Sequence, residues 1–373
     1  MTIDRIDEIE AIKNLDLPTT EDFRRIVLED RPLIDMRASV EFKKGAFPNT
    51  VNLPLMNNRE RHLIGIRYKE EGNASAVALG KELVSPLKPK RVKAWIDFLK
   101  TNPDAYLYCF RGGQRSQISQ AWIEESGLST PRLKGGYKAF RQFLMQESEL
   151  ISSQAETLII GGYTGSGKTL LIHKLKNSID LEGLANHRGS SFGGFTTPQP
   201  SQIDFENRLA YELIKHKSQK HKQLIIEDES RNIGQINIPK PIFDNFQKGQ
   251  LIILETPISE RVDITFDEYV TEALKTYRAE YGSYGTDQWF ADANQGLERI
   301  KKRLGLENYL KISRVFAQAF SIQKASGELN QHKEWIEILL QKYYDPMYDY
   351  QIKKSQIPIL FRGSTEEILE RYG

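Results

Sequence analysis

The chain of 373 residues is 39% hydrophobic and 27% charged, and its formal net charge is +2. Length and composition are ordinary for a globular protein of two domains, and the small net charge excludes a polycation without excluding a local nucleic-acid site. No apolar run approaches the roughly 20 residues that span a bilayer, and residues 1–14 lack the apolar core of a signal peptide, so we expect a cytoplasmic protein with no membrane partner.

Residues 33–54 predict the opening of an α/β domain. Leu33-Ile34-Asp35 reads as a short buried strand that ends on an acid, and Arg37 and a helical turn at residues 40–42 follow it. Residues 45–54 predict a turn, a short strand and a second turn, because glycine, proline and asparagine flank the β-branched residues.

The only cysteine of the chain lies where a strand meets a helix. The apolar run 105–108 predicts the strand, Cys109 follows it, and a Gly-Gly turn then leads into an amphipathic helix. The turn can aim backbone N–H groups inward, and these groups, the helix N-terminus and two arginines all favour a negative charge. We therefore predict that Cys109 is a catalytic thiolate. The oxyanion-binding residues that we predict around it are Arg111, Gly112, Gly113, Arg115 and Ser116.

This loop does not define its oxyanion, because the Cys-x5-Arg-Ser spacing also suits tyrosine-phosphatase-type chemistry. The order of elements resembles the rhodanese-type sulfurtransferase domain, whose first strand ends in Asp-x-Arg with Glu-Phe and Gly-x-x-Pro-x-x-x-Asn downstream. The resemblance covers roughly residues 15–150. Two departures are visible: the usual sulfur-carrying loop is one residue shorter than residues 109–115, and a minimal domain lacks an insertion such as residues 56–83.

A second unit is predicted after a short polar linker at residues 147–156. Residues 157–160 predict a strand, residues 162–169 match G-x-x-x-x-G-K-[ST] in full, and residues 170–176 predict a helix, which is the context that a P-loop requires. Backbone N–H groups would cradle a phosphate chain beside the point charge of Lys168, and Thr169 could ligand Mg²⁺. The predicted phosphate-binding residues are Gly162, Thr164, Gly165, Ser166, Gly167, Lys168 and Thr169.

Further strands at residues 224–226 and 251–254 alternate with helices and predict a parallel sheet covered on its faces. The first of these ends beside Asp228, where a Walker-B acid belongs. The polar segment 187–193, which includes Arg188, predicts a surface loop beside the phosphate site. From residue 267 onward the pattern is helical and aromatic, and we expect a helix to break at Pro346.

These patterns predict three domains. They are a rhodanese-like α/β domain at residues 15–150, a P-loop NTPase-like parallel α/β domain at 151–310 and a helical C-terminal extension at 311–373. Two basic runs, residues 215–222 and 299–303, are either solvated helix faces or RNA contacts.

A wide rhodanese-type cradle fused to a P-loop domain is rare, and nearly the whole chain resembles the tRNA 2-selenouridine synthase family. The segments that carry the resemblance are residues 109–116, the insertion ending in Ala78-Leu79-Gly80, and residues 165–169, 180–185, 187–193, 201–207, 227–231 and 343–348. It implies supporting roles for Gly80, Arg188 and Asp228. Tyr108 stands where a relative can carry a second cysteine, which leaves Cys109 as the sole nucleophile.

The family resemblance implies a transferase that acts on the wobble 2-thiouridine in the anticodon loop of tRNA. The base is first S-geranylated from geranyl diphosphate, and selenophosphate then displaces the geranylthio group to give 2-selenouridine. Both compounds are co-substrates, no tightly bound cofactor is expected, and a functional link to selenophosphate synthetase is implied. Cys109 would form a perselenide-type intermediate, while Arg111, Arg115 and the Gly112-Gly113 amides hold the phosphate.

Three other functions stay open at this point. A Cys-x5-Arg phosphatase with a nucleotide-binding domain would need a general acid on a nearby loop. A P-loop kinase or GTPase could carry an inert rhodanese-like module. A thiosulfate sulfurtransferase fits the wider loop less well and leaves the P-loop domain without a role.

Overall fold

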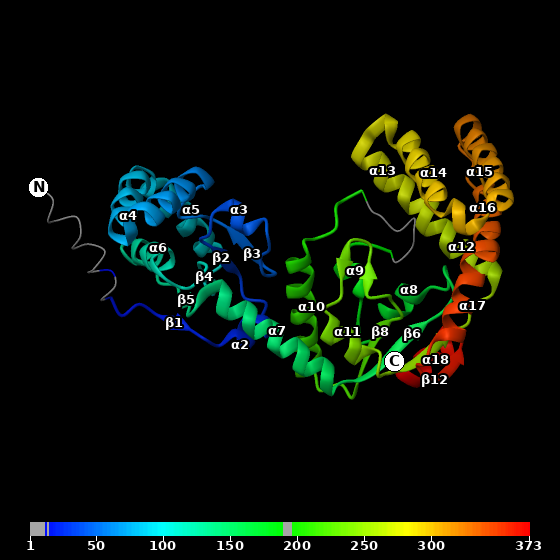
Figure 1. Ribbon diagram of the computed structural model, residues 1–373, viewed down its shortest axis with the longest axis horizontal. Coiled ribbons are helices and arrows are strands. Elements are labelled where there is room, and N and C mark those ends of the chain that lie inside the picture. Colours follow the sequence, from blue (N-terminus) through cyan, green and yellow to red (C-terminus); the bar gives the residue numbers. More distant parts are fainter. Residues whose placement is uncertain (1–11, 13–14, 189–195) are drawn as a thin grey trace, which may run out of the picture. The chain divides into compact units, whose positions relative to one another are not determined.

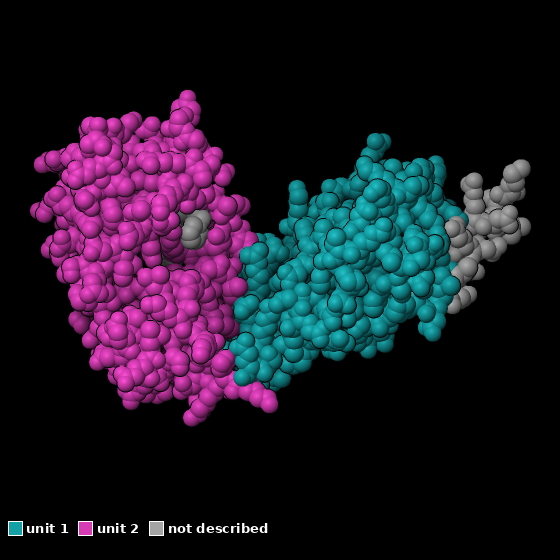
Figure 2. Space-filling view, turned by 180° about the vertical axis from the view of Figure 1, so that it is seen from behind, with its two compact units in different colours: residues 1–151, 201–219 teal, residues 152–200, 220–373 magenta. Residues whose placement is uncertain are grey.

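The computed structural model describes residue 12 and residues 15–188 and 196–373. The chain forms two compact units, shown in Figures 1 and 2: unit 1 comprises Met1–Ile151 and Ser201–Gln219, and unit 2 comprises Ser152–Pro200 and Lys220–Gly373. Each unit is built on a five-stranded parallel sheet, so the α/β class is confirmed. Among the described helices, none combines the length and the apolar character that a bilayer crossing needs.

The sheet of unit 1 has the strand order β1-β5-β4-β2-β3. Its strands are β1 (Thr19–Thr20), β2 (Leu33–Asp35), β3 (Thr50–Asn52), β4 (Tyr106–Tyr108) and β5 (Arg132–Leu133). Its helices are α2 (Phe23–Leu28), α3 (Ser39–Phe42), α4 (Asn58–Val84), α5 (Lys88–Thr101), α6 (Gln114–Glu124), α7 (Gly136–Gln154) and α10 (Gln202–Ser218). The strand predicted at residues 33–35 is confirmed, and all three of its residues are buried in the centre of the sheet.

The insertion predicted from the sequence forms the long helix α4. The side chain of Asn57 caps it by accepting a hydrogen bond from Glu60 N at 2.9 Å, and Glu60 Oε2 accepts the reciprocal bond from Asn57 N. The helix kinks at Gly72, whose φ of 83° and ψ of −174° lie outside the helical region. Only glycine adopts this conformation without strain, so the kink is built into the sequence.

The predicted linker at residues 147–156 contains the boundary between the two units, after Ile151, but it is helical, because α7 continues to Gln154. Leu144, Ser148 and Ile151 follow one another at helical spacing and are all buried. Ser148 also donates its hydroxyl to Leu144 O at 2.6 Å, which satisfies its polar atom inside the packed face. This part of α7 therefore has one buried face and one polar, exposed face. A count of its polar residues does not reveal the buried face.

Helix α10 belongs to unit 1, although its sequence lies between elements of unit 2. Asn207 of this helix donates to Ala46 O at 2.7 Å, and Asp204 accepts from Ala46 N at 2.8 Å. Gly45 makes the approach possible, because a Cβ at this position would collide with the side chain of Ile203. The sequence places this helix with the P-loop region, whereas its contacts anchor it on the turn after α3.

The sheet of unit 2 has the strand order β12-β11-β6-β8-β7. Its strands are β6 (Glu156–Gly161), β7 (Ser178–Ile179), β8 (Gln223–Glu227), β11 (Gln250–Leu254) and β12 (Ile359–Gly363), and its flanking helices are α8 (Lys168–Ile172), α9 (Leu181–Ala185), α11 (Lys240–Phe246) and α18 (Thr365–Tyr372). A small hairpin pairs β9 (Asn232–Ile233) with β10 (Ile236–Asn237). Helix α8 ends at Ile172, four residues earlier than predicted.

The C-terminal region is not purely helical. Strand β12 pairs in parallel with β11, and Ile368 of α18 is buried in the core beneath the sheet. The segment predicted as a helical extension therefore returns to the sheet and supplies its edge strand.

The chain between β11 and β12 forms a group of helices with its own apolar core, coloured yellow to orange-red in Figure 1. They are α12 (Ile258–Phe266), η2 (Asp267–Glu272), α13 (Ala273–Tyr281), α14 (Gly285–Leu304), α15 (Leu306–Ser326), α16 (His332–Leu339), η4 (Leu340–Tyr344) and α17 (Asp345–Lys354). Trp289, Phe316 and Trp335 are buried at its centre. The aromatic residues after 267 thus serve largely as core.

The helix break predicted at Pro346 is wrong. Residues 332–354 run as α16, η4 and α17 without leaving helical backbone angles, and Pro346 lies in the first turn of α17. The π-helical turn η4 precedes it. This wider π-helical turn leaves room for the proline ring, which would clash with a regular α-helical turn. It also lets the helix continue without the backbone N–H that proline lacks.

Candidate functional site

Cys109 lies directly after β4 and is 3% exposed. Its Sγ is 3.1 Å from Ser116 Oγ, and Gly113 O lies 2.9 Å from the same oxygen, so the single hydroxyl hydrogen of Ser116 can be donated to Gly113 O or, when Cys109 is a thiolate, to its sulfur. Gly113 caps the N-terminus of α6, so Ser116 projects from the first turn of that helix. The fold thus places the thiol and a hydroxyl donor together at a helix N-terminus, where a negative charge is favoured.

The loop after Cys109 has its shape because three glycines pack against one another. Gly112 has a φ of 66°, and a Cβ there would come within 2.8 Å of Leu133 O and 2.9 Å of Gly135 N. A Cβ on Gly136 would collide with Cys109 O. The first amides of α7 bind the loop from the same side, because Tyr137 N donates to Cys109 O at 2.8 Å.

The two predicted cradle arginines have different environments. Arg111 is exposed and lies at the cavity above Cys109. Arg115 Nη1 donates to Glu41 Oε2 at 2.7 Å, and Arg61 of α4 lies 3.0 Å from the same oxygen. Burial opposes ionisation of Glu41, but the hydrogen bond and charge of Arg115, the charge of Arg61 and the hydrogen bond from Ala38 N together outweigh it and lower the pKa of the Glu41 carboxyl. The sequence analysis did not predict that Glu41 pairs with Arg115, or that Arg61 pairs with the same carboxylate.

Arg132 is a further cation at the loop that the sequence did not predict. Its Nη1 donates to Gly112 O at 3.3 Å. Burial lowers the pKa of Arg132, and a negative charge on Cys109 acts in the opposite direction. Since Arg132 lies in β5, 23 positions after Cys109, only strand pairing brings it beneath the loop.

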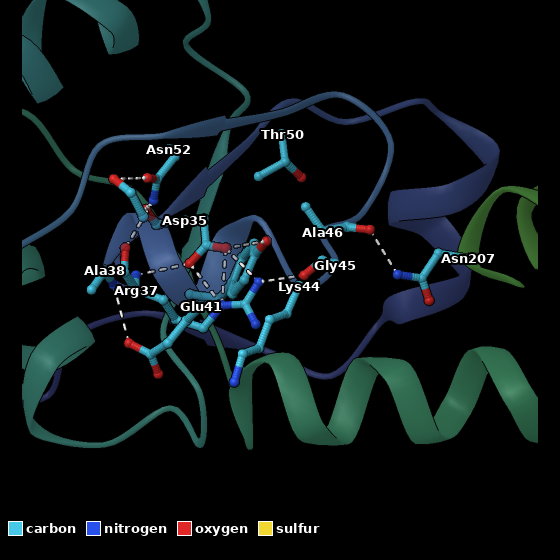
Figure 3. A network of polar contacts seen from close by, with 12 residues as sticks. Asp35, Arg37, Ala38, Glu41, Lys44, Gly45, Ala46, Thr50, Asn52 and Asn207 are labelled. Atoms are coloured by element: carbon cyan, nitrogen blue, oxygen red, sulfur yellow. Dashed lines mark hydrogen bonds and ion pairs between the residues drawn. The ribbon is translucent and has the colours of Figure 1, made fainter. Parts of the chain in front are cut away.

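A buried polar network holds the β2 end of this unit (Figure 3). Arg37 forms a salt bridge with Asp35 at 2.7 Å and donates to Gly45 O at 2.8 Å. Asn52 donates to Asp35 O and to Arg37 O at 3.0 and 2.8 Å. Tyr108 donates its hydroxyl to Asp35 at 3.0 Å. The network joins β2, β3 and β4 immediately below Cys109, so it can position the loop.

A cavity of about 1080 Å³ opens onto Cys109 within unit 1. It brings together four predicted residues, Cys109, Arg111, Gly113 and Arg115, with Gly80 of α4. The insertion therefore contributes directly to this site.

The P-loop of unit 2 connects β6 to α8. Gly165 and Gly167 have φ values of 76° and 85°, and a Cβ on Gly162 would lie 2.7 Å from Ser166 Oγ. Lys168 Nζ donates to Gly162 O at 3.0 Å, and Thr169 Oγ1 donates to Glu182 Oε2 at 3.3 Å. The loop thus closes on itself with its lysine inside, as expected for a phosphate cradle.

Acidic side chains collect beside Lys168. Burial raises the pKa of Asp228, which Lys168 opposes. Burial and the nearby Glu182 raise the pKa of Glu229 well above its usual value. Buried acids beside a P-loop lysine can hold a proton, or bind a cation that arrives with a phosphate chain.

A cavity of about 620 Å³ covers this part of unit 2 and includes every predicted P-loop residue together with Asp228 and Arg188. Residues 189–193 of the predicted loop lie outside the described residues. In the described ranges no group of three or more His, Cys, Asp or Glu is arranged to hold a metal ion, so Mg²⁺ at Thr169 stays a prediction. Two contributors were missed. Arg261 of α12 donates to Thr164 O at 3.0 Å and pairs with Asp345 at 2.5 Å, and Glu268 lies at the cavity.

Comparison with known proteins points in one direction. Residues 155–373 match a family model described as the tRNA 2-selenouridine synthase AAA domain. A relative from Sulfurovum sp. (strain NBC37-1), named tRNA 2-selenouridine synthase, is 54% identical over 95% of this chain and 97% of its own. Relatives of the same name from Hydrogenovibrio crunogenus and Shewanella frigidimarina are 48% and 46% identical, each over 94% of this chain and over 98% and 96% of their own.

A solved structure of the N-terminal domain of a protein described as ATP/GTP-binding, from Clostridium difficile 630, is 27% identical and covers 37% of this chain and 96% of its own. Its TM-score of 0.29 is too low to indicate a shared architecture.

Proposed function

This chain belongs to the tRNA 2-selenouridine synthase family, and we propose that it converts the wobble 2-thiouridine of tRNA to 2-selenouridine by way of S-geranyl-2-thiouridine. The observation that carries the proposal is 54% identity over 95% of the chain to a protein of that name. The substrate is the anticodon loop of tRNA, whose unpaired base can be splayed out without melting a duplex. A cytoplasmic location and a link to selenophosphate synthetase follow from the same substrates.

The geranylation step is proposed for the P-loop. The C2 sulfur of the base attacks the allylic carbon of geranyl diphosphate, the carbon–oxygen bond breaks, diphosphate leaves with the electron pair, and N3 loses its proton. Lys168 and the amides of the loop would stabilise the charge on the departing diphosphate. The contacts of Lys168 Nζ with main-chain oxygens of the loop at 3.0 and 3.4 Å support this role, because they hold its charge at the centre of the cradle.

The selenium step is proposed for the Cys109 site. At the base, the C2–Se bond forms and the C2–S bond breaks, and the sulfur leaves as geranylthiolate, which takes up a proton to become geranylthiol. We propose that the Cys109 thiolate attacks the phosphorus of selenophosphate, which breaks the Se–P bond and releases selenide for the attack on C2, while Arg111, Arg115 and the loop amides bind the phosphate group. Water then hydrolyses the S–P bond and frees Cys109 and phosphate, so the step needs no oxidant or reductant. The thiol beside Ser116 Oγ at a helix N-terminus supports this assignment.

Unit 1 is proposed to be a rhodanese-like domain and unit 2 a P-loop NTPase-like domain. For unit 1 the support is the Asp35–Arg37 ion pair at the end of β2, with the Cys109 loop following the adjacent strand β4. Co-substrates are geranyl diphosphate and selenophosphate, and no tightly bound cofactor is part of the proposal.

Mass spectrometry of nucleosides tests the proposal. Full-length protein is incubated with 2-thiouridine tRNA, geranyl diphosphate and selenophosphate, beside a Cys109→Ser variant. We expect 2-selenouridine from the wild type and S-geranyl-2-thiouridine from the variant. Unchanged tRNA in both would overturn the proposal and favour phosphatase or NTPase activity, to be measured on the same preparations.

A further inference from the structure

The cavity above Cys109 is larger than an oxyanion site needs. Its volume of about 1080 Å³ lies at the upper end of pockets that enclose whole organic ligands. Cys109, Arg111 and Arg115 occupy one part of its wall, which suffices for a phosphate-sized anion. The rest of the cavity requires a different occupant.

The remaining wall is mostly apolar and comes from the insertion helix α4 and from α6. The lining residues on these two helices that are aliphatic, aromatic or small are Ile64, Gly65, Ile66, Tyr68, Ala76, Val77, Gly80, Val84, Ile118 and Trp122. Small residues on the α4 side leave space, since a Cβ on Gly80 would only reach ordinary contact with Ile64 at 3.5 Å.

This apolar surface extends to the sulfur. Cys109 is buried in one apolar cluster with Val84 and Trp122, and Ile118 packs against that cluster. On the loop itself, Phe110 is 39% exposed and also lines the cavity. Exposed apolar surface beside a reactive group marks a site for an apolar ligand.

We propose that this part of the cavity binds the hydrocarbon chain of an S-alkylated 2-thiouridine while the C2–S bond faces Cys109. The inference rests on the proposed function, in which the chain is a ten-carbon isoprenoid. It assigns recognition of the alkylated intermediate to unit 1 and gives α4 a role that phosphate binding does not need. The alkyl group acts as a handle, because the unmodified thiocarbonyl has nothing to place in the cavity.

Affinity should therefore rise with the length of the alkyl chain. Each CH₂ that moves from water into an apolar wall tightens binding roughly fourfold, and ordering of a flexible chain offsets part of that gain. Between a methyl and a ten-carbon thioether we expect the dissociation constant to fall by at least about tenfold.

The test measures binding of the full chain to anticodon stem-loop RNAs that carry S-methyl, five-carbon S-prenyl or ten-carbon S-geranyl 2-thiouridine. The variants Val77→Trp and Ile64→Trp fill the cavity from α4. Ala78→Trp is the matched control, because Ala78 is exposed on the same helix and is not among the lining residues. In the wild type and in Ala78→Trp, we expect the affinity for the RNA to increase with the length of the alkyl chain. In a folded filling variant we expect this increase to be lost, while the affinity for the S-methyl RNA stays unchanged.

An affinity that does not depend on chain length in the wild type would overturn the inference. The inference would also be overturned if the increase of affinity with chain length persisted in both filling variants. Conversion of the S-geranyl RNA by selenophosphate is followed separately. If the wild type forms 2-selenouridine while the filling variants keep the gain, the proposed function stands and the chain binds elsewhere. If the gain behaves as expected but no 2-selenouridine forms, the cavity binds alkyl chains and the proposed reaction fails.

Discussion

At the residue scale, the cysteine site depends on one hydroxyl and several charges that come from different elements. Ser116 lies 3.1 Å from Cys109 Sγ, whereas Arg115 is already paired with Glu41. An anion that binds at Arg115 must therefore share this arginine with Glu41 or displace it. The short contact with Ser116, by contrast, is in place before any substrate arrives.

Replacement of Ser116 by alanine should slow the reaction of Cys109 with iodoacetamide at pH 7 by about tenfold. Loss of a hydrogen bond to a charged group costs roughly 1.5 kcal/mol, which corresponds to that factor. The alkylation rate constant is measured by mass spectrometry of the intact protein. Ser119→Ala is the control, because this buried serine of α6 donates to Arg115 O at 2.9 Å instead. Equal rates for Ser116→Ala and wild type would contradict the prediction.

Glu227, at the end of β8, is 1% exposed and accepts a hydrogen bond from Leu181 N at 2.8 Å. Burial, followed by the negative charge of Asp180, raises the pKa of its carboxyl well above the usual value. The folded protein therefore holds this proton at pH values where the unfolded chain has lost it. Linkage then requires that stability falls as pH rises from the unfolded pKa through the folded one.

We expect Glu227→Gln to raise the melting temperature at pH 8 and to leave it nearly unchanged at pH 4.5, because an amide has no charge to desolvate. The measurement is thermal unfolding of both proteins across this pH range. A variant that is less stable than wild type at pH 8 would show that the ionised carboxylate is stabilised in the fold.

At the element scale, α4 is the part of unit 1 that a minimal rhodanese-type domain would not contain, and it builds one wall of the cavity above Cys109. Its shape depends on the kink at Gly72, while Gly65 lies in regular helix. Gly72 therefore has backbone angles that suit only glycine, whereas Gly65 has helical angles that alanine also adopts. A Cβ at either position meets nothing within 4 Å, so side-chain clashes play no part in the comparison.

Substitution of these glycines by alanine should change the stability of unit 1 in opposite directions. Gly72→Ala should destabilise it by roughly 1–3 kcal/mol, since the backbone angles there suit only glycine. Gly65→Ala should stabilise it by roughly 0.5–1 kcal/mol, since alanine favours a helix interior. Urea unfolding followed by circular dichroism gives both values. If the free energy of unfolding changed in the same direction in both variants, the kink would not depend on Gly72.

At the scale of the whole molecule, two cavities lie in different units and are lined by different chemistry. The cavity in unit 1 has a thiol, arginines and apolar helix faces, and the cavity in unit 2 has a P-loop lysine and buried acids. The proposed reaction assigns one step to each cavity: departure of a diphosphate to unit 2 and arrival of selenium to unit 1.

Lys168→Ala should abolish geranylation of 2-thiouridine tRNA and leave selenation of pre-geranylated tRNA largely intact. Loss of one preorganised cation beside a leaving group typically lowers the rate by a factor of roughly 10²–10³. Nucleoside mass spectrometry follows each step separately, with Lys176→Ala as the control for an exposed lysine outside the P-loop. Equal loss of both steps would contradict a division between two sites.

Much of the architecture and of the candidate sites could be predicted from the sequence, because the signals lie in contiguous residues. The strand at residues 33–35, the Cys109 loop and the P-loop each combine an apolar run, a glycine turn and a helix start within about 15 positions. Local propensity and turn geometry decide such segments. The break at Pro346 was wrong, because a π-helical turn precedes the proline and the helix continues. The linker at residues 147–156 holds the boundary of the two units but is helical, because packing on one face overrides its local polarity.

By itself the sequence determined where the cysteine loop and the P-loop lie and which residues are candidates for the thiolate and the two anion cradles, since turn conformation and charge are encoded locally in those motifs. Only the tertiary structure decided what surrounds them. Glu41 reaches Arg115 across 74 positions, Arg132 arrives through strand pairing, and the apolar wall above Cys109 depends on how α4 packs. These contacts join segments whose spacing carries no signal, because their geometry follows from burial of the core and not from any neighbour in the chain.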